Sequence, residues 1–192
     1  MRTRLPRAER ELQMLETARE LFAARGYAAV TMDEVAAAVG VTKPLLYNYY
    51  GNKEQLFLAC MQPAADALVT AVVSAVQSAQ DAPEALRAGI HAFFAFLDSD
   101  GEAWRLLHDD MISPPPTREI AAFMSGYRAR LGDLVTASLQ ERTESRAVEP
   151  LAVAIFGAAE ALGRWWLTSD GMSAERTAEL LIRTIEPGLR MR

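Results

Sequence analysis

Apolar residues recur along the chain at intervals of three and four positions, which places them on one side of an α-helix. Leu15, Ala18 and Phe22 show this spacing near the start, and Leu86 and Ile90 show it near the middle. Alternation of apolar and polar residues, which is typical of strands, is scarce. The pattern predicts an all-α protein with about nine helices and no strand.

Helix-start and helix-stop residues divide the chain into these segments. The first helix is expected from about Glu9 to Arg25, with Gly26 ending it in a left-handed conformation. Thr31 is expected to cap the second helix, and Glu34 completes a capping box three residues later. Thr42 is expected to cap the third helix, and Asn52 is expected to cap the fourth, with Gln55 completing a second capping box. Further boundaries are expected at Gly40, Gly51, Asp81, residues 99–101, residues 114–116, Thr117 and residues 169–171.

A long apolar helix is expected over residues 53–79, and Pro63 lies inside it. An interior proline removes one backbone hydrogen bond and clashes with the preceding turn. The sequence therefore predicts a kink or break near residues 59–63.

The short segment VTKPLLYNYYGNKEQL, residues 41–56, differs from an ordinary core helix. At about 100° per residue, Leu46 and Tyr50 share one side and anchor the helix. A helix buried on one side normally shows charge on its other side. The outward arc here carries one cation among apolar, amide and hydroxyl groups, namely Lys43, Pro44, Leu45, Tyr47, Asn48 and Tyr49.

This outward arc has the chemistry of major-groove recognition. Asn can bond adenine, Lys can bond guanine, and Leu or Pro can contact a thymine methyl group. Tyr and Thr hydroxyls can bond phosphates. Two short helices joined at Gly40 form a helix-turn-helix. Packing of the same helix inside a bundle is the alternative.

The charge distribution modifies this interpretation. A net charge of −5 argues against nucleic acid, but residues 1–54 hold eight Lys or Arg against seven Asp or Glu. Residues 35–53 contain no acidic side chain, so repulsion from a polyanion is absent there.

Composition also bears on location and chemistry. The single cysteine, Cys60, cannot form an internal disulfide, and the first residues lack the apolar core of a signal peptide. We find no run of about 18 apolar residues to span a bilayer, so a cytoplasmic location is expected. No nucleophile–base pair, paired carboxylates or metal-ligand spacing is evident, so no enzyme activity is expected; a helical enzyme or a helical interaction protein without DNA binding is the alternative.

The segment LETARELFAARGYAAVTMDEVAAAVGVTKPLLYNYYGNKEQLFLAC, residues 15–60, resembles the DNA-binding head of the TetR family of transcriptional regulators. The tail GAAEALGRWWL…AELLIRTIEPGLR resembles the family's C-terminal dimerising helices more loosely. Leu45, Pro44 and Pro63 depart from the family's usual residues. The matching positions are Phe22, Gly26, Tyr27, Thr31, Ala36, Gly40, Val41, Lys43, Leu46, Tyr47, Tyr49, Tyr50, Lys53 and Glu54.

The resemblance implies a helix-turn-helix head over residues 1–52 and a ligand-binding and dimerisation core over residues 53–192. It implies a homodimer that binds near-palindromic operator DNA, usually as a repressor, and a small-molecule effector held in the core. By the same resemblance, Thr42, Lys43, Leu45 and Asn48 face bases. The residues expected at phosphates are Thr31, Tyr47, Tyr49 and Lys53.

The expected helix over residues 148–168 is apolar almost all round, so it needs cover on two sides. One side can be its own core and the other a partner subunit; burial within one subunit is the alternative. The predicted dimer interface contains Leu151, Ile155, Ala158, Leu162, Trp165, Leu181 and Ile185.

Large side chains on the central helices predict an effector pocket for an apolar or aromatic compound. For each of them, ordinary core packing is the alternative. No metal or cofactor is expected, because His108, Asp109 and Asp110 occupy successive helix positions and diverge by about 100°. The predicted pocket residues are Phe93, Phe94, Trp104, His108, Met111, Phe123, Tyr127 and Trp166.

Overall fold

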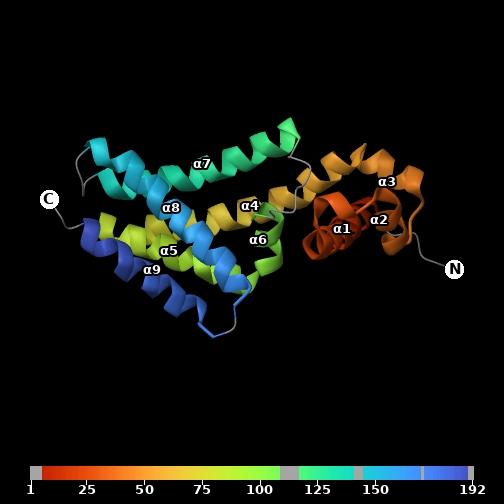
Figure 1. Ribbon diagram of the computed structural model, residues 1–192. Coiled ribbons are helices and arrows are strands. Elements are labelled where there is room, and N and C mark those ends of the chain that lie inside the picture. The colour runs from red at the N-terminus through yellow and green to blue at the C-terminus, as the bar shows by residue number, and fades with distance from the viewer. Residues whose placement is uncertain (1–5, 109–116, 141–144, 170, 190–192) are drawn as a thin grey trace. The chain divides into compact units, whose positions relative to one another are not determined.

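The computed structural model describes residues 6–108, 117–140, 145–169 and 171–189, and this part of the chain forms nine α-helices and no strand (Figure 1). The prediction of an all-α fold is confirmed. The helices are α1 (Arg7–Ala29), α2 (Met32–Val39), α3 (Lys43–Tyr50), α4 (Lys53–Ser78), α5 (Ala82–Ser99), α6 (Gly101–His108), α7 (Arg118–Gln140), α8 (Ser145–Leu167) and α9 (Ala174–Leu189).

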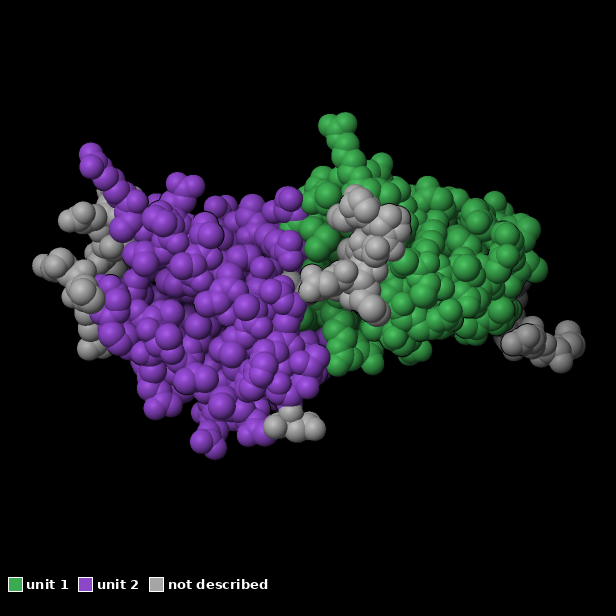
Figure 2. Space-filling view, in the orientation of Figure 1, with its two compact units in different colours: residues 1–65, 102–124 green, residues 66–101, 125–192 purple. Residues whose placement is uncertain are grey.

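The chain divides into two compact units (Figure 2). Unit 1 comprises residues 1–65 and 102–124, and unit 2 comprises residues 66–101 and 125–192. Helices α4 and α7 therefore contribute residues to both units. This division differs from the domain boundary expected after residue 52, and that boundary remains a prediction.

In unit 1, α1 and α3 each pack against α2 (Figure 1). Phe22, Leu46 and Phe57 are almost completely buried, and the Phe22 and Phe57 rings meet edge-on with centroids 5.0 Å apart. Complete burial of one such side chain stabilises the fold by roughly 1.5–3 kcal/mol. These contacts fix the short helices, which are too short to be stable alone.

Of the two glycines expected to end α1 and α2, Gly40 does so and Gly26 does not. Gly40 ends α2 in the left-handed region, with φ 76° and ψ 35°, and its N–H donates to the carbonyls of Ala36 and Ala37. Gly26 also has positive φ, at 75°, but its ψ of 162° differs from the left-handed helical value. Helix α1 is kinked there and continues for three residues to Ala29, so it ends later than predicted.

The predicted caps are formed in part. The Asn52 Oδ1 atom accepts a hydrogen bond from the Gln55 N–H at 2.9 Å. The Gln55 side-chain amide donates to Glu119 at 2.7 Å instead of closing a capping box. Thr42 occupies the N-cap position of α3 as expected, but its side chain makes no capping hydrogen bond.

In unit 2, α5, α8 and α9 pack against one another (Figure 1). Phe94, Leu97 and Ile182 are among the buried side chains at their core. A Cβ atom at Gly163 of α8 would lie 2.9 Å from Leu97 Cδ2 and 3.2 Å from the Phe93 ring. The absence of a side chain at Gly163 therefore lets α8 approach α5 closely.

Helix α4 runs through Pro63 without a break, so the predicted break does not occur. The helix also contains an 18-residue window with a mean hydropathy of 1.7, long and apolar enough to cross a membrane. This corrects the expectation that no such run exists. Half of that window is buried within the protein, as in the core helix of a soluble protein.

Candidate nucleic-acid interface

Helix α3 is anchored by the two residues that the sequence indicated. Leu46 is completely buried and Tyr50 is nearly so. The Tyr50 hydroxyl donates to the carbonyl oxygen of Glu11 on α1 at 3.2 Å. Burial, aided by the nearby Glu11 charge, raises the pKa of Tyr50 above its usual value, so the phenol stays a neutral donor. These contacts fix the rotation of α3 about its axis.

The opposite side of α3 is open to solvent, as the spacing of about 100° per residue predicted. Lys43, Pro44 and Asn48 are exposed, and Tyr47 retains 38% of its accessible surface. Leu45 and Tyr49, on the flank, are half-buried. A polar, largely uncharged surface on an anchored helix is the arrangement that can enter a DNA groove.

Lys43 is held by a partner that the sequence analysis missed. Its Nζ lies 2.8 Å from Asp33 Oδ1 on α2, and the hydrogen bond to Asp33 raises the pKa of Lys43. Both side chains are more than half exposed. Such exposed ion pairs contribute little to stability, so Lys43 can exchange Asp33 for a phosphate or base at little cost.

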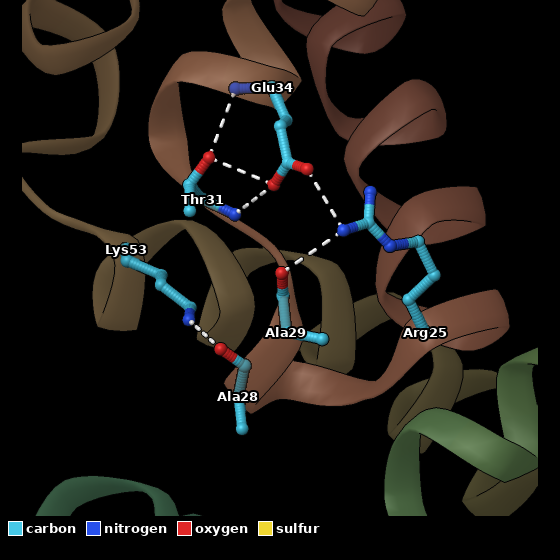
Figure 3. Close-up of polar contacts among 6 residues, drawn as sticks. All are labelled: Arg25, Ala28, Ala29, Thr31, Glu34 and Lys53. Atoms are coloured by element: carbon cyan, nitrogen blue, oxygen red, sulfur yellow. Dashed lines mark hydrogen bonds and ion pairs between the residues drawn. The ribbon is translucent and has the colours of Figure 1, made fainter.

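Thr31 forms the predicted capping box at the start of α2 (Figure 3). Its Oγ1 accepts from the Glu34 N–H at 3.2 Å, and Glu34 Oε2 accepts from the Thr31 N–H at 2.8 Å. Arg25 of α1 donates to Glu34 Oε1 at 2.9 Å and to the Ala29 carbonyl at 3.2 Å. The network therefore fixes the start of α2 against α1.

Lys53, expected at a phosphate, is turned toward the end of α1 (Figure 3). Its Nζ donates to the Ala28 carbonyl at 3.3 Å and lies 4.4 Å from the centroid of the Tyr27 ring. Partial burial lowers the pKa of Lys53. An ammonium group has three donors, so these contacts leave hydrogen-bonding capacity for a phosphate.

A further pair of cations lies beside α3. Arg7 and Arg10 of α1 line one concave surface together with Leu45, Asn48 and Tyr49. The Arg7 guanidinium carbon lies 5.5 Å from the centroid of the Tyr49 ring. The predicted first helix began at about Glu9, which left Arg7 outside it. Pro6, which stands at the N-cap of α1, was the available signal for an earlier start.

The predicted effector residues are dispersed. An apolar pocket in unit 2 is lined by side chains of α4, α5, α7 and α8, and Phe93 is the predicted residue that contributes to it. Phe94, Trp104 and Tyr127 are buried as core side chains. Trp166 is half-buried, and its indole N–H donates to the Met172 carbonyl at 2.7 Å. Phe123, in unit 1, is half-buried; the His108 side chain and Met111 lie outside the described residues.

The predicted dimer residues also differ in exposure. Ile155 and Leu181 are buried within the chain itself, and their place at a dimer interface remains a prediction. Trp165 is 48% exposed. Leu151, Ala158, Leu162 and Ile185 are half-buried. Two large apolar side chains that the sequence analysis did not single out are also exposed, Val153 on α8 and Leu180 on α9.

Titratable groups give no sign of a metal centre in the described part of the chain, where no three His, Cys, Asp or Glu side chains converge. Asp109 and Asp110 lie outside it. The Cys60 thiol is buried, which raises its pKa to about 12, and it donates to the Leu15 carbonyl at 3.7 Å. Cys60 is therefore a packed thiol with little thiolate character.

The three-helix unit, with α3 anchored on one side and open on the other, defines a helix-turn-helix DNA-binding protein. Comparison with known proteins gives the family. Residues 14–60 match the family model "Bacterial regulatory proteins, tetR family", and residues 82–187 match "Tetracyclin repressor-like, C-terminal domain". The chain belongs to the TetR family of transcriptional regulators.

Relatives and solved structures agree with this assignment. The chain is 34% identical, over 87% of its length and 76% of the relative's, to the HTH-type transcriptional activator FasR of Mycolicibacterium smegmatis. A TetR-like regulator from Rhodococcus sp. RHA1 is 31% identical with a TM-score of 0.84, covering 98% of this chain and 100% of that one. AibR, solved with isovaleryl coenzyme A and operator DNA, is 27% identical with a TM-score of 0.75, covering 91% and 97%.

Proposed function

We propose that this regulator binds a near-palindromic operator as a homodimer, represses transcription while bound, and is released by a small apolar effector. It acts without catalysis and in the cytoplasm. The observation that carries the proposal is the outward surface of α3, which stays polar and exposed while Leu46 and Tyr50 are buried behind it. A helix used only for packing has no reason to present this surface.

Residue roles follow from position on α3 and around it. Thr42, Lys43, Leu45 and Asn48, with Pro44 between them, face the bases of the major groove. The hydroxyl groups of Thr31, Tyr47 and Tyr49 and the ammonium group of Lys53 contact phosphates. Lys43 gives up Asp33 when it meets the duplex, because the exposed pair is weak.

A homodimer is proposed because one head carries few cations, and few phosphate contacts give weak binding. Two heads on a two-fold axis address half-sites about 34–36 Å apart. The exposed apolar side chains of α8 and α9, Val153, Trp165 and Leu180, supply a surface for the partner subunit. The AibR complex with operator DNA and an acyl thioester supports a regulator of this fold that binds both kinds of ligand.

Activation of transcription is the alternative to repression. FasR, at 34% identity, is named as an activator. A promoter carrying the selected operator, fused to a reporter, distinguishes the two. Repression predicts higher expression when the regulator is removed, and activation predicts lower expression.

Selection of bound DNA from a random pool tests the proposal directly. The expected product is a near-palindrome, and a gel shift with it should weaken steeply between two salt concentrations. Lys43→Ala and Tyr47→Phe should weaken binding while circular dichroism shows an unchanged fold. Failure to enrich any sequence, with no gel shift at either salt, would favour a helical interaction protein that does not bind DNA.

Release by effector is proposed to act through α4, which contributes residues to both units. The ligand shifts the regulator only by its difference in affinity for the DNA-binding and released states. Pro63, an exposed proline two residues before the unit boundary, is where the helix lacks a backbone hydrogen bond. Pro63→Ala should change the response of DNA binding to effector; an unchanged response and unchanged DNA affinity would remove the hinge from the mechanism.

A further inference from the structure

The apolar pocket of unit 2 has walls made mostly of aliphatic side chains. Val72 of α4, Ile90 of α5, Leu131 and Val135 of α7 and Ile155 of α8 are typical of its lining. The empty space, counted out to its open mouth, is about 520 Å³.

The polar side chains that line the pocket are already bonded inside the subunit. The Ser138 hydroxyl donates to the Leu134 carbonyl on its own helix at 2.9 Å. The Glu160 carboxylate accepts from Arg128 Nε at 3.0 Å, and only 14% of the Glu160 side chain is exposed. The Ser138 donor is already used and a carboxylate has none, so an acceptor oxygen of a ligand buried here would remain unpaired, which is unfavourable. An enclosed segment of a ligand should therefore lack carbonyl and carboxylate oxygens.

Gly89 keeps part of this space open. It lies inside α5, where glycine weakens a helix relative to alanine. A Cβ atom at Gly89 would stand 3.2 Å from Val76 Cγ2 and 3.7 Å from Val72 Cγ1, both on the α4 wall. Any larger side chain at this position would extend into the pocket or push α4 away.

We propose that the pocket binds the aliphatic chain of an acyl compound, with the polar end of the compound at the mouth, and that Gly89 determines whether the chain fits. The proposal rests on the proposed function, because it names the chemical class of the effector. Branched aliphatic walls on four helices suit a flexible chain that follows the space between them. Two aromatic rings, Phe93 and Phe156, also line the pocket, and the Phe93 ring packs edge-on against Phe94 with centroids 5.1 Å apart.

The test is isothermal titration calorimetry of the full-length protein, without DNA, against saturated fatty acids from hexanoate to dodecanoate. Each added methylene should tighten binding about fourfold until the pocket is full, which corresponds to about 0.8 kcal/mol per CH₂. Decanoate should bind more tightly than 4-phenylbutanoate, which has the same ten carbons. Octanoic acid and its N-acetylcysteamine thioester are titrated side by side, because an acyl chain can reach the protein as a free acid or as a thioester. Binding that tightens with chain length in either form supports the proposal.

Two variants locate the bound chain. Gly89→Leu should weaken decanoate binding at least tenfold, whereas Gly126→Leu, on α7 where an added Cβ meets no atom within 4 Å, should stay within about twofold of the parent. Ala159→Leu narrows the pocket from α8 and should give the same loss, so a misfolded Gly89→Leu variant leaves the proposal testable. Circular dichroism checks the fold of each variant.

Three results would overturn the proposal: affinity that does not depend on chain length, tighter binding of 4-phenylbutanoate than of decanoate, or unchanged decanoate binding in both well-folded wall variants. Gel shifts on the same preparations separate this proposal from the proposed function. If the protein binds DNA but no fatty acid, the acyl effector is rejected and the operator-binding role stands. If it binds fatty acids but no DNA, the operator-binding role is rejected and the acyl-binding pocket stands.

Discussion

At the scale of single residues, Glu34 links two helices of the candidate interface through one carboxylate (Figure 3). Its oxygens accept from the Thr31 N–H and hydroxyl at 2.8 Å and from Arg25 at 2.9 Å. The hydrogen bond from Arg25, followed by those from Thr31, lowers the pKa of Glu34 to about 2 from an ordinary value of 4.5. The capping network is therefore complete only while this carboxyl is ionised.

This lowered pKa predicts a pH window for its contribution to stability. The unfolded chain protonates Glu34 near pH 4.5, so the contribution is fully present above that value and is lost as pH falls toward 2. Exposure to solvent keeps its size small. Carboxyl-carbon NMR should show Glu34 titrating near pH 2, and Glu34→Gln should flatten the fall in unfolding free energy across this window. A Glu34 titration near pH 4.5 would contradict the network.

Arg10 offers a second residue-scale prediction, because it lines the concave surface beside Asn48 and Tyr49. A cation that neutralises one phosphate releases about one counterion. Arg10→Ala should therefore reduce the slope of log affinity against log salt by about 1 and weaken binding alike for different sequences.

The control for Arg10 is Arg176→Ala, which removes the same charge from an exposed position on α9 in unit 2. It should leave the salt slope unchanged. Equal slopes for parent and Arg10→Ala would show that Arg10 does not contact DNA. An equal reduction of the salt slope in both variants would instead indicate a general effect of net charge.

At the scale of helices, two glycines differ in backbone conformation and burial, so the same substitution can be compared at both. Gly26 has φ 75° and ψ 162°, a region that only glycine adopts readily, and it is buried at the kink of α1. Gly126 lies inside α7 and is exposed, and a Cβ atom added there would meet no other atom within 4 Å. The same substitution to alanine should therefore act in opposite directions at the two positions.

Urea unfolding measures the difference. Gly26→Ala should lower the unfolding free energy by about 1–3 kcal/mol, because the backbone must move or remain strained. Gly126→Ala should raise it by about 0.4–1 kcal/mol, since alanine restricts the unfolded chain and favours the helix. A Gly26→Ala variant as stable as the parent would show that the kink in α1 is not constrained by its surroundings.

Most helix boundaries were predictable because their signals are local in sequence. Thr31 and Glu34 are three residues apart, and the capping box formed as expected. The box expected at Asn52 did not close, because the side chain of Gln55 bonds to Glu119, 64 residues away. Such a partner is invisible to a pattern that compares near neighbours. Lys43 and Asp33 are a similar case, because their pairing depends on the packing of α3 against α2.

The apolar pocket of unit 2 was the least predictable feature, for a physical reason. Periodicity shows which side of a helix faces inward, but it does not distinguish a packed side chain from one beside empty space. Phe93 and Phe94 are neighbours in sequence and both are buried, yet Phe93 lines the pocket and Phe94 is completely enclosed. Free space is a property of several helices together, and here it arose among aliphatic residues that carried no chemical signal.

At the scale of the whole molecule, a negative net charge is compatible with DNA binding because the charged residues are unevenly distributed. The chain carries −5 overall, yet residues 35–53 have no acidic side chain. Arg7 and Arg10 add two cations beside that stretch in the folded head. Within one subunit this remains a small number of cations for a polyanion, so useful affinity requires a second head. Dimerisation and DNA binding are therefore expected to be lost together.

The exposed apolar residues of unit 2 provide the means to test this coupling. Val153 is 68% exposed and Trp165 is 48% exposed, both on α8. Removing large apolar groups from water is a main driving force for association, and a charge placed there opposes it. In sedimentation, the parent should have twice the 21.1 kDa chain mass, whereas Val153→Glu and Trp165→Glu should approach the single-chain mass at micromolar concentration.

The control is Leu12→Glu, which places the same charge at an apolar residue of α1 that is 58% exposed in unit 1. It should remain dimeric. Gel shifts with the selected operator should show Val153→Glu and Trp165→Glu binding at least tenfold more weakly, because one head keeps only half of the phosphate contacts. Monomeric variants that bind the operator as tightly as the parent would separate dimerisation from DNA binding, and variants that stay dimeric would place the subunit interface elsewhere.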